Sequence, residues 1–126
     1  MTETQRELRR LIAAELNEIP GGTYHRTAPP DAAYPYKVYG LERVSIGERG
    51  RQDYSLVVDV WDRSGDTKHA ERITDMITQK LQEELLPQDK ILPYFYFDNG
   101  YPVPDSDREL THYQLHFLVQ TYLKED

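Results

Sequence analysis

The stretch LVVDVWDRSGDTKHAERITDMITQKL, Leu56–Leu81, decides the fold. It starts inside a predicted strand that spans residues 52–62 and ends in a predicted helix. In the strand, side chains alternate between two faces, and the apolar face carries Tyr54, Leu56, Val58 and Val60. In the helix, apolar residues recur at helical spacing, at Ala70, Ile73, Ile77 and Leu81. Both apolar faces are expected to meet one core.

Acidic residues at the strand-to-helix junction raise the question of a metal or catalytic site. An EF-hand loop needs oxygen ligands at its first, third and fifth positions, glycine at the sixth and glutamate at the twelfth. Neither a loop counted from Asp59 nor one counted from Asp62 meets this pattern. Asp66 or Ser64 can instead cap the helix, with His69 in its first turn. We therefore predict a structural turn.

The other elements follow from the same periodicities. Apolar residues at helical spacing predict an amphipathic first helix whose Arg6, Arg9 and Arg10 face solvent, rather than a membrane or nucleic acid. The full expectation is a helix over 4–19, a loop over 20–33, strands over 34–46 and 52–62 joined by a turn, the second helix, a strand over 90–100, a loop over 101–107 and a strand over 109–123.

This order, α-β-β-α-β-β, predicts an α+β fold. Two amphipathic helices should pack on one face of an antiparallel β-sheet, because each apolar stripe needs a surface against which to be buried. The length of 126 residues fits one domain, spanning 1–126. Pro93 should place its strand at a sheet edge or at a strand start, since proline has no N–H to donate.

Composition and charge exclude several functional classes. The net charge of -7 argues against nucleic-acid binding, which normally uses a basic surface. The chain has no cysteine, which excludes disulfides and thiolate metal sites. No run of about 18 apolar residues is present, so we expect no membrane span. The N-terminus lacks the apolar segment of a signal peptide, and we expect synthesis in the cytoplasm.

Enzyme chemistry is not indicated by the sequence. His112 and His116 would share one strand face but lie about 13 Å apart, too far to bind one metal ion. A solvated or interface face is the favoured interpretation of the pair. No nucleophile motif, Walker loop or dinucleotide-binding fingerprint is present. We expect no catalytic residue, no metal and no cofactor.

Tyrosine is unusually frequent, with ten tyrosines against three phenylalanines. Such residues suit half-buried surfaces and subunit interfaces. The alternatives are a wet sheet face for the strand residues and plain solvent loops for residues 47–51 and 98–107. The candidate contacts to other protein subunits are Tyr34, Tyr36, Glu48, Arg49, Arg51, Tyr94, Tyr96 and Tyr101.

The motif YPYKVYG (Tyr34–Gly40), a glycine-containing hairpin loop and the stretch Leu56–Leu81 together resemble the tail completion proteins of long-tailed phages. These proteins are similar in fold to tail terminators. The resemblance covers roughly residues 4–122. It implies a virion structural protein, assembled in the host cytoplasm, that forms a ring, commonly a hexamer, at the head-proximal end of the tail.

The resemblance also implies the partners. Such a ring would contact the tail tube protein, end tube growth and meet the head-tail connector, while the genome passes through its lumen. The net charge of -7 suggests an acidic lumen that DNA passes without specific binding. The alternatives are a head-side connector component, a small-molecule-binding regulatory α+β domain and a hydrolase that uses the scattered Asp and His residues.

Overall fold

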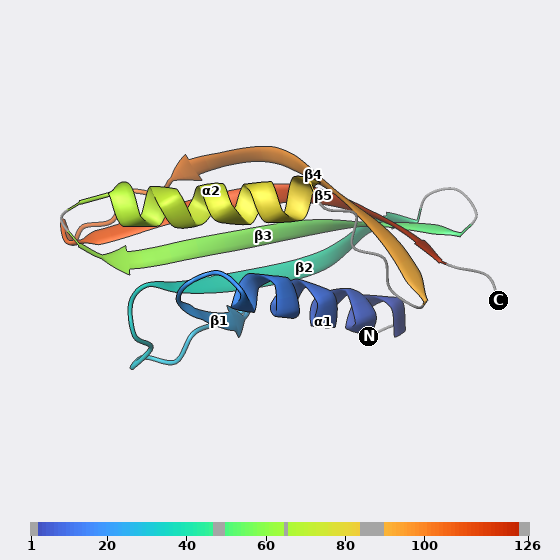
Figure 1. Cartoon of the computed structure of the whole chain (residues 1–126), viewed down its shortest axis with the longest axis horizontal. Coiled ribbons are helices and arrows are strands. Elements are labelled where there is room, and N and C mark those ends of the chain that lie inside the picture. The colour runs from blue at the N-terminus through green and yellow to red at the C-terminus, as the bar shows by residue number, and fades with distance from the viewer. Residues whose placement is uncertain (1–2, 47–49, 65, 84–89, 124–126) are drawn as a thin grey trace.

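The computed structural model describes residues 3–46, 50–64, 66–83 and 90–123. In order, its elements are α1 (Glu3–Asn17), β1 (Gly22–His25), β2 (Tyr36–Ile46), β3 (Arg51–Arg63), α2 (Lys68–Glu83), β4 (Ile91–Pro102) and β5 (Leu110–Leu123). The strands form one sheet in the order β1-β2-β3-β5-β4. Both helices lie on the same side of this sheet (Figure 1). The predicted α+β class and the two-layer arrangement are confirmed.

The element order differs from the prediction at β1, which falls inside the predicted loop 20–33. Four residues of β1 pair with Tyr36–Tyr39 of β2 in parallel, so the sheet is mixed rather than purely antiparallel. A strand this short has no readable alternation, and proline and glycine flank it on the N-terminal side. Gly21 has a φ of 97° and turns the chain after α1 so that it runs beside β2.

The rest of the sheet agrees with the predicted pairing. β2 and β3 form the expected antiparallel hairpin, and its turn at 47–49 lies outside the described residues. β4 is an edge strand and contains Pro93, as predicted. It continues to Pro102, two residues beyond the predicted strand end. An edge strand tolerates this proline because one side of its backbone needs no partner within the sheet.

The core lies between the helices and one face of the sheet. The four predicted core residues of β3 are fully buried, as are Ala70, Ile77, Leu8, Ile12 and Leu16 on the helices. β5 adds Leu115, Phe117 and Val119 to the same face. Burying each large aliphatic side chain contributes roughly 1.5–3 kcal/mol, so these stripes hold the two layers together.

Lys37 stabilises the C-terminal end of α1 from within the core layer. Its side chain is fully buried, and its Nζ donates to the carbonyl oxygens of Ile19 (2.9 Å), Pro20 (3.0 Å) and Gly21 (2.6 Å). Burial lowers the pKa of Lys37 to about 8. The ammonium therefore satisfies three carbonyls of the turn that follows α1, and its charge lies beyond the C-terminal end of that helix, where it complements the dipole.

The acidic junction between β3 and α2 is a structural turn, as predicted. Asp66 accepts a hydrogen bond from the N–H of Lys68, the first helical residue (2.9 Å). Asp62 is buried, accepts from the N–H of Arg63 (2.9 Å) and lies 3.4 Å from His69 Nδ1. The turn therefore accounts for these carboxylates through local hydrogen bonds and capping.

Candidate assembly surface

The sheet face opposite the helices, called the open face here, is the main candidate surface. Within the described parts of the chain, no helix covers it (Figure 1). Long strands present alternate side chains to it, and several of these are aromatic. A sheet face that carries large apolar side chains without a covering layer is typical of a protein interface.

Aromatic rings form a row across one end of the open face. The Tyr34 and Tyr36 ring centroids lie 5.3 Å apart, and Tyr36 stacks on Trp61 at 6.4 Å with an interplanar angle of 21°. Trp61 in turn stacks on His112 at 3.8 Å and 14°. The guanidinium of Arg63 lies 5.5 Å above the Tyr34 ring. Mutual stacking holds these rings in place, so a partner would meet a preordered surface.

His112 and His116 both lie on the open face, as predicted for this strand. His112 Nε2 is 2.6 Å from the Asp59 carboxylate, which also accepts a hydrogen bond from Gln114 (3.0 Å). His116 instead contacts Gln114 and Tyr101. Among the described residues, no hydroxyl is hydrogen-bonded to His112. The Asp59–His112 pair therefore orients the ring that stacks on Trp61.

A second cluster occupies the far end of the open face, on β4 and β5. The Tyr94 and Tyr122 rings meet edge to face at 5.8 Å. Tyr96 lies opposite Leu118 across the two strands and is 48% exposed. Leu118 and Tyr122 are exposed as well. This cluster of four large side chains has no covering layer among the described residues.

The structure places most of the predicted contact residues on the open face. Those on or beside it are Tyr34, Tyr36, Tyr94, Tyr96 and Tyr101. Arg51 lies in β3, and its guanidinium is paired with Asp53 at 3.1 Å. Glu48 and Arg49 lie outside the described residues. The tyrosines are thus brought onto one surface, whereas Arg51 is already paired within the chain.

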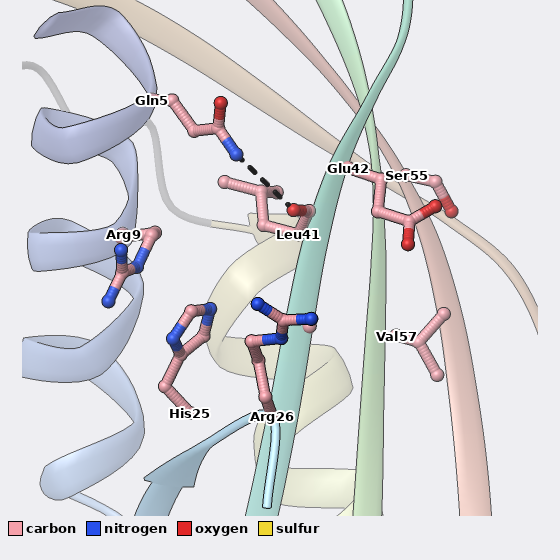
Figure 2. A pocket seen from close by; sticks show the side chains of 9 residues that line it. Gln5, Arg9, His25, Arg26, Leu41, Glu42, Ser55 and Val57 are labelled. Carbon is pink, nitrogen blue, oxygen red and sulfur yellow. Dashed lines mark hydrogen bonds between the residues drawn. The ribbon is translucent and has the colours of Figure 1, made fainter. Parts of the chain in front are cut away.

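A groove at the edge of β2, called the edge groove here, is the second candidate surface (Figure 2). Its volume is about 410 Å³. α1, the end of β1, β2 and β3 contribute its walls, which are formed by Gln5, Arg9, His25, Arg26, Gly40, Leu41, Glu42, Ser55 and Val57. A cavity of this size can hold a short segment of a partner or a small ligand.

Basic side chains dominate the edge groove. Arg9 from α1 and His25 and Arg26 from the end of β1 gather in the gap between α1 and β2 (Figure 2). Glu42 is the acidic residue among the lining side chains. Burial lowers the pKa of His25, and the nearby charges of Arg9 and Arg26 lower it further. The groove is a local positive site on an acidic protein.

Arg26 has an unusual backbone conformation for a side-chain-bearing residue. Its φ is 74°, in the left-handed region where glycine is normally found. Holding a non-glycine residue there costs on the order of 1–3 kcal/mol. Glycine at this position would relieve the strain.

Arg26→Gly is therefore expected to raise the free energy of unfolding by up to about 1 kcal/mol, because glycine adopts this φ without strain but adds entropy to the unfolded chain. Urea denaturation measures the change. Arg26→Ala removes the same charge but keeps the strain, and we expect no gain from it. If the glycine variant proved less stable than the alanine variant, the positive φ of Arg26 would not lower the stability of the protein.

Sequence patterns missed the edge groove and part of the second cluster. Arg9 was expected on the solvent face of its helix, but it is partly buried and lines the groove. Arg6 and Arg10 are exposed as expected. No local pattern links Arg9 to the distant residues His25 and Arg26. For Leu118 and Tyr122, alternation along the last strand could have placed both on the face of Tyr94.

Comparison with known proteins identifies the family. The family model described as "Tail completion protein gp17" matches residues 7–122. The chain belongs to the tail completion protein gp17 family. It is a structural protein of phage tails, and the predicted resemblance is confirmed. Among curated protein sequences, no significant match is found.

Solved structures support the same fold. A chain from the virion of a native gene transfer agent particle has a TM-score of 0.68 at 14% identity, and the match covers 88% of this chain and 84% of that chain. A second solved chain, whose name states no function, has a TM-score of 0.58 at 13% identity, covering 94% and 96%. At these identities the likeness shows the fold alone.

Two further structural findings concern metal binding and membrane insertion. In the described residues, no three His, Cys, Asp or Glu side chains are grouped so that they could hold a metal ion. None of the described helices has the length and apolar character required to cross a membrane.

Proposed function

We propose that this tail completion protein forms a ring, most simply a hexamer, at the head-proximal end of the tail tube. The ring ends growth of the tube and joins the tail to the head. Its partners are further copies of the same chain, the tail tube protein and the head-tail connector protein. The protein assembles in the host cytoplasm and remains in the virion.

The uncovered, tyrosine-rich sheet face carries this proposal, together with membership of the family. A ring needs two different patches on each copy, because every subunit contacts its two neighbours with different surfaces. The aromatic row at Trp61 and the cluster at Tyr96 lie at separate ends of the open face. The predicted contacts Tyr34, Tyr36 and Tyr94 belong to these two patches.

The genome would pass through the lumen of the ring without specific binding. The net charge of -7 supports a lumen that repels phosphate groups and lets DNA slide. We expect the purified protein not to bind duplex DNA at low ionic strength, where electrostatic attraction would be strongest. Tight binding there would contradict this part of the proposal.

Removal of the gene from the phage or prophage that encodes it tests the proposal. Without the protein, we expect filled heads and unattached tails, tails of irregular length, and loss of infectious or transducing particles. A plasmid copy of the gene should restore all three. Tails of normal length joined to heads in the absence of the protein would contradict the proposal.

A further inference from the structure

The edge groove leaves part of one sheet edge without a strand partner. β1 pairs only with Tyr36–Tyr39 of β2. Just after β1 ends, the Arg26 N–H donates one more backbone hydrogen bond to β2, to the Tyr39 oxygen (2.9 Å). Further along β2, among the described residues, the backbone oxygen of Leu41 accepts a hydrogen bond from the side-chain amide of Gln5 in α1. At 3.5 Å this hydrogen bond is long. Unpaired edges of this kind accept an added extended segment.

The shape of the groove also admits a close backbone approach. A Cβ placed on Gly40 would meet nothing within 4 Å, so the absence of a side chain there leaves space beside Val57 and Ser55. Figure 2 shows His25 in the gap between α1 and β2, with the Arg26 side chain beside it and next to β2. A segment lying along Gly40 and Leu41 would therefore be within reach of basic side chains.

Charge identifies the kind of occupant. Arg9 and Arg26 line the groove against the single carboxylate of Glu42, whereas the whole chain has a net charge of -7. His25 adds a polar side chain but little charge near neutral pH, because its pKa is lowered. Copies of such a chain repel one another at long range, so their contact needs a local site of opposite charge. Duplex DNA is a poorer occupant, because a groove of about 410 Å³ is too small to enclose a duplex.

We propose that the edge groove binds an acidic, extended surface segment of a second copy of this chain. The inference rests on the proposed function, since it assigns one side of the contact between neighbours in the ring. The sheet order favours such a contact. The β2 side and the β4 side lie at opposite ends of the sheet, so a segment beside β4 of one copy can reach the groove of the next.

Site-specific photocrosslinking in assembled particles identifies the occupant directly. A photoreactive amino acid at Glu42 should give an adduct of two copies of this chain, and mass spectrometry should map the second site to an acidic segment. A parallel sample carries the photoreactive residue at Tyr96, on the open face. An adduct with another protein or with DNA would overturn the inference, and so would a failure at residue 42 when residue 96 crosslinks.

Matched variants test the contribution of charge and shape. Arg26→Glu and Arg10→Glu change the net charge equally, but Arg10 is 71% exposed and does not line the groove. Arg26→Glu should reduce the copies incorporated per particle at least about tenfold relative to Arg10→Glu. Gly40→Val adds a side chain whose Cβ meets nothing within 4 Å in the free chain, and it should give a similar loss with little change in the melting temperature.

The possible results distinguish a failure of this inference from a failure of the proposed function. If the wild-type chain forms its ring and both groove variants assemble as well as Arg10→Glu, the groove is not the contact and the inference is overturned. If the wild-type chain is absent from particles, the proposed function itself fails. Loss of assembly in both groove variants, with Arg10→Glu unaffected, supports the inference.

Discussion

Lys37→Met should lower the free energy of unfolding by about 2–4 kcal/mol. The ammonium of Lys37 donates to three carbonyl oxygens in the turn after α1, and methionine leaves all three without this donor. Each unsatisfied buried group costs about 1–3 kcal/mol. Water can reach the carbonyls of Pro20 and Gly21 in part, and the variant no longer buries a charge, so the net loss is smaller than the sum. Chemical denaturation measures it.

Lys80→Met is the control for Lys37→Met. Lys80 pairs with Glu15, whose side chain is 16% exposed, and with Glu18, whose side chain is 65% exposed, so water can replace the lost ammonium fully at Glu18 and in part at Glu15. We expect a smaller loss than in Lys37→Met, because fewer buried groups lose their donor. Equal losses in the two variants would contradict the role assigned to Lys37.

The pH dependence gives Lys37 a second signature. Its pKa is about 8 in the folded protein, against an ordinary lysine pKa of 10.5, so between these values the unfolded chain binds the proton and the folded chain does not. Stability contributed by Lys37 therefore rises as pH rises through this window. The stability difference between wild type and Lys37→Met should grow over the same interval, and a difference that shrank would contradict the assignment.

Gly21→Ala should also lower stability strongly, by about 2–4 kcal/mol. Gly21 has a φ of 97°, which alanine adopts only with strain. In addition, an added Cβ would lie 2.7 Å from the backbone oxygen of Pro35, so the chain must shift. Thermal or urea denaturation measures the loss.

Alanine substitutions at two other glycines distinguish the effect of backbone strain from the effect of the contact with Pro35. Gly50 has a φ of 82°, but a Cβ added there would meet open space, so Gly50→Ala should show the strain alone, about 1 kcal/mol. Gly40 has open space and no positive φ, so Gly40→Ala should be close to neutral. A loss in Gly21→Ala no larger than that in Gly50→Ala would show that the contact with Pro35 is unimportant.

The α1–β1 junction matters for function because it builds the edge groove. Lys37 and Gly21 hold the turn that leads from α1 into β1. Arg9 on α1 and Arg26 after β1 are brought together only by that turn. Destabilising the junction is therefore expected to weaken assembly as well as folding.

Sequence periodicity predicted the parts of the fold that have long, regular patterns. Residues 52–62 alternate cleanly, and Leu56 and Val58 are buried as the alternation requires. Ile73 and Ile77 on α2 likewise follow the helical period. The surplus of tyrosine also predicted an exposed aromatic surface, because the core of a chain of this size cannot cover ten tyrosines.

The features that escaped prediction depend on contacts distant in sequence or on backbone conformation. β1 is four residues long and is fixed by its pairing with β2 rather than by its own pattern. The positive φ of Arg26 is a property of the turn it occupies. The stacking of His112 on Trp61 depends on the β3–β5 register, which brings Trp61 opposite His112.

Cryo-electron microscopy of purified particles tests the central claim most directly. We predict density for this chain as a closed ring between the head-proximal end of the tail tube and the head, with the open face or the edge groove buried between copies. Particles in which the chain is absent, or lies elsewhere than at that junction, would contradict the proposed function.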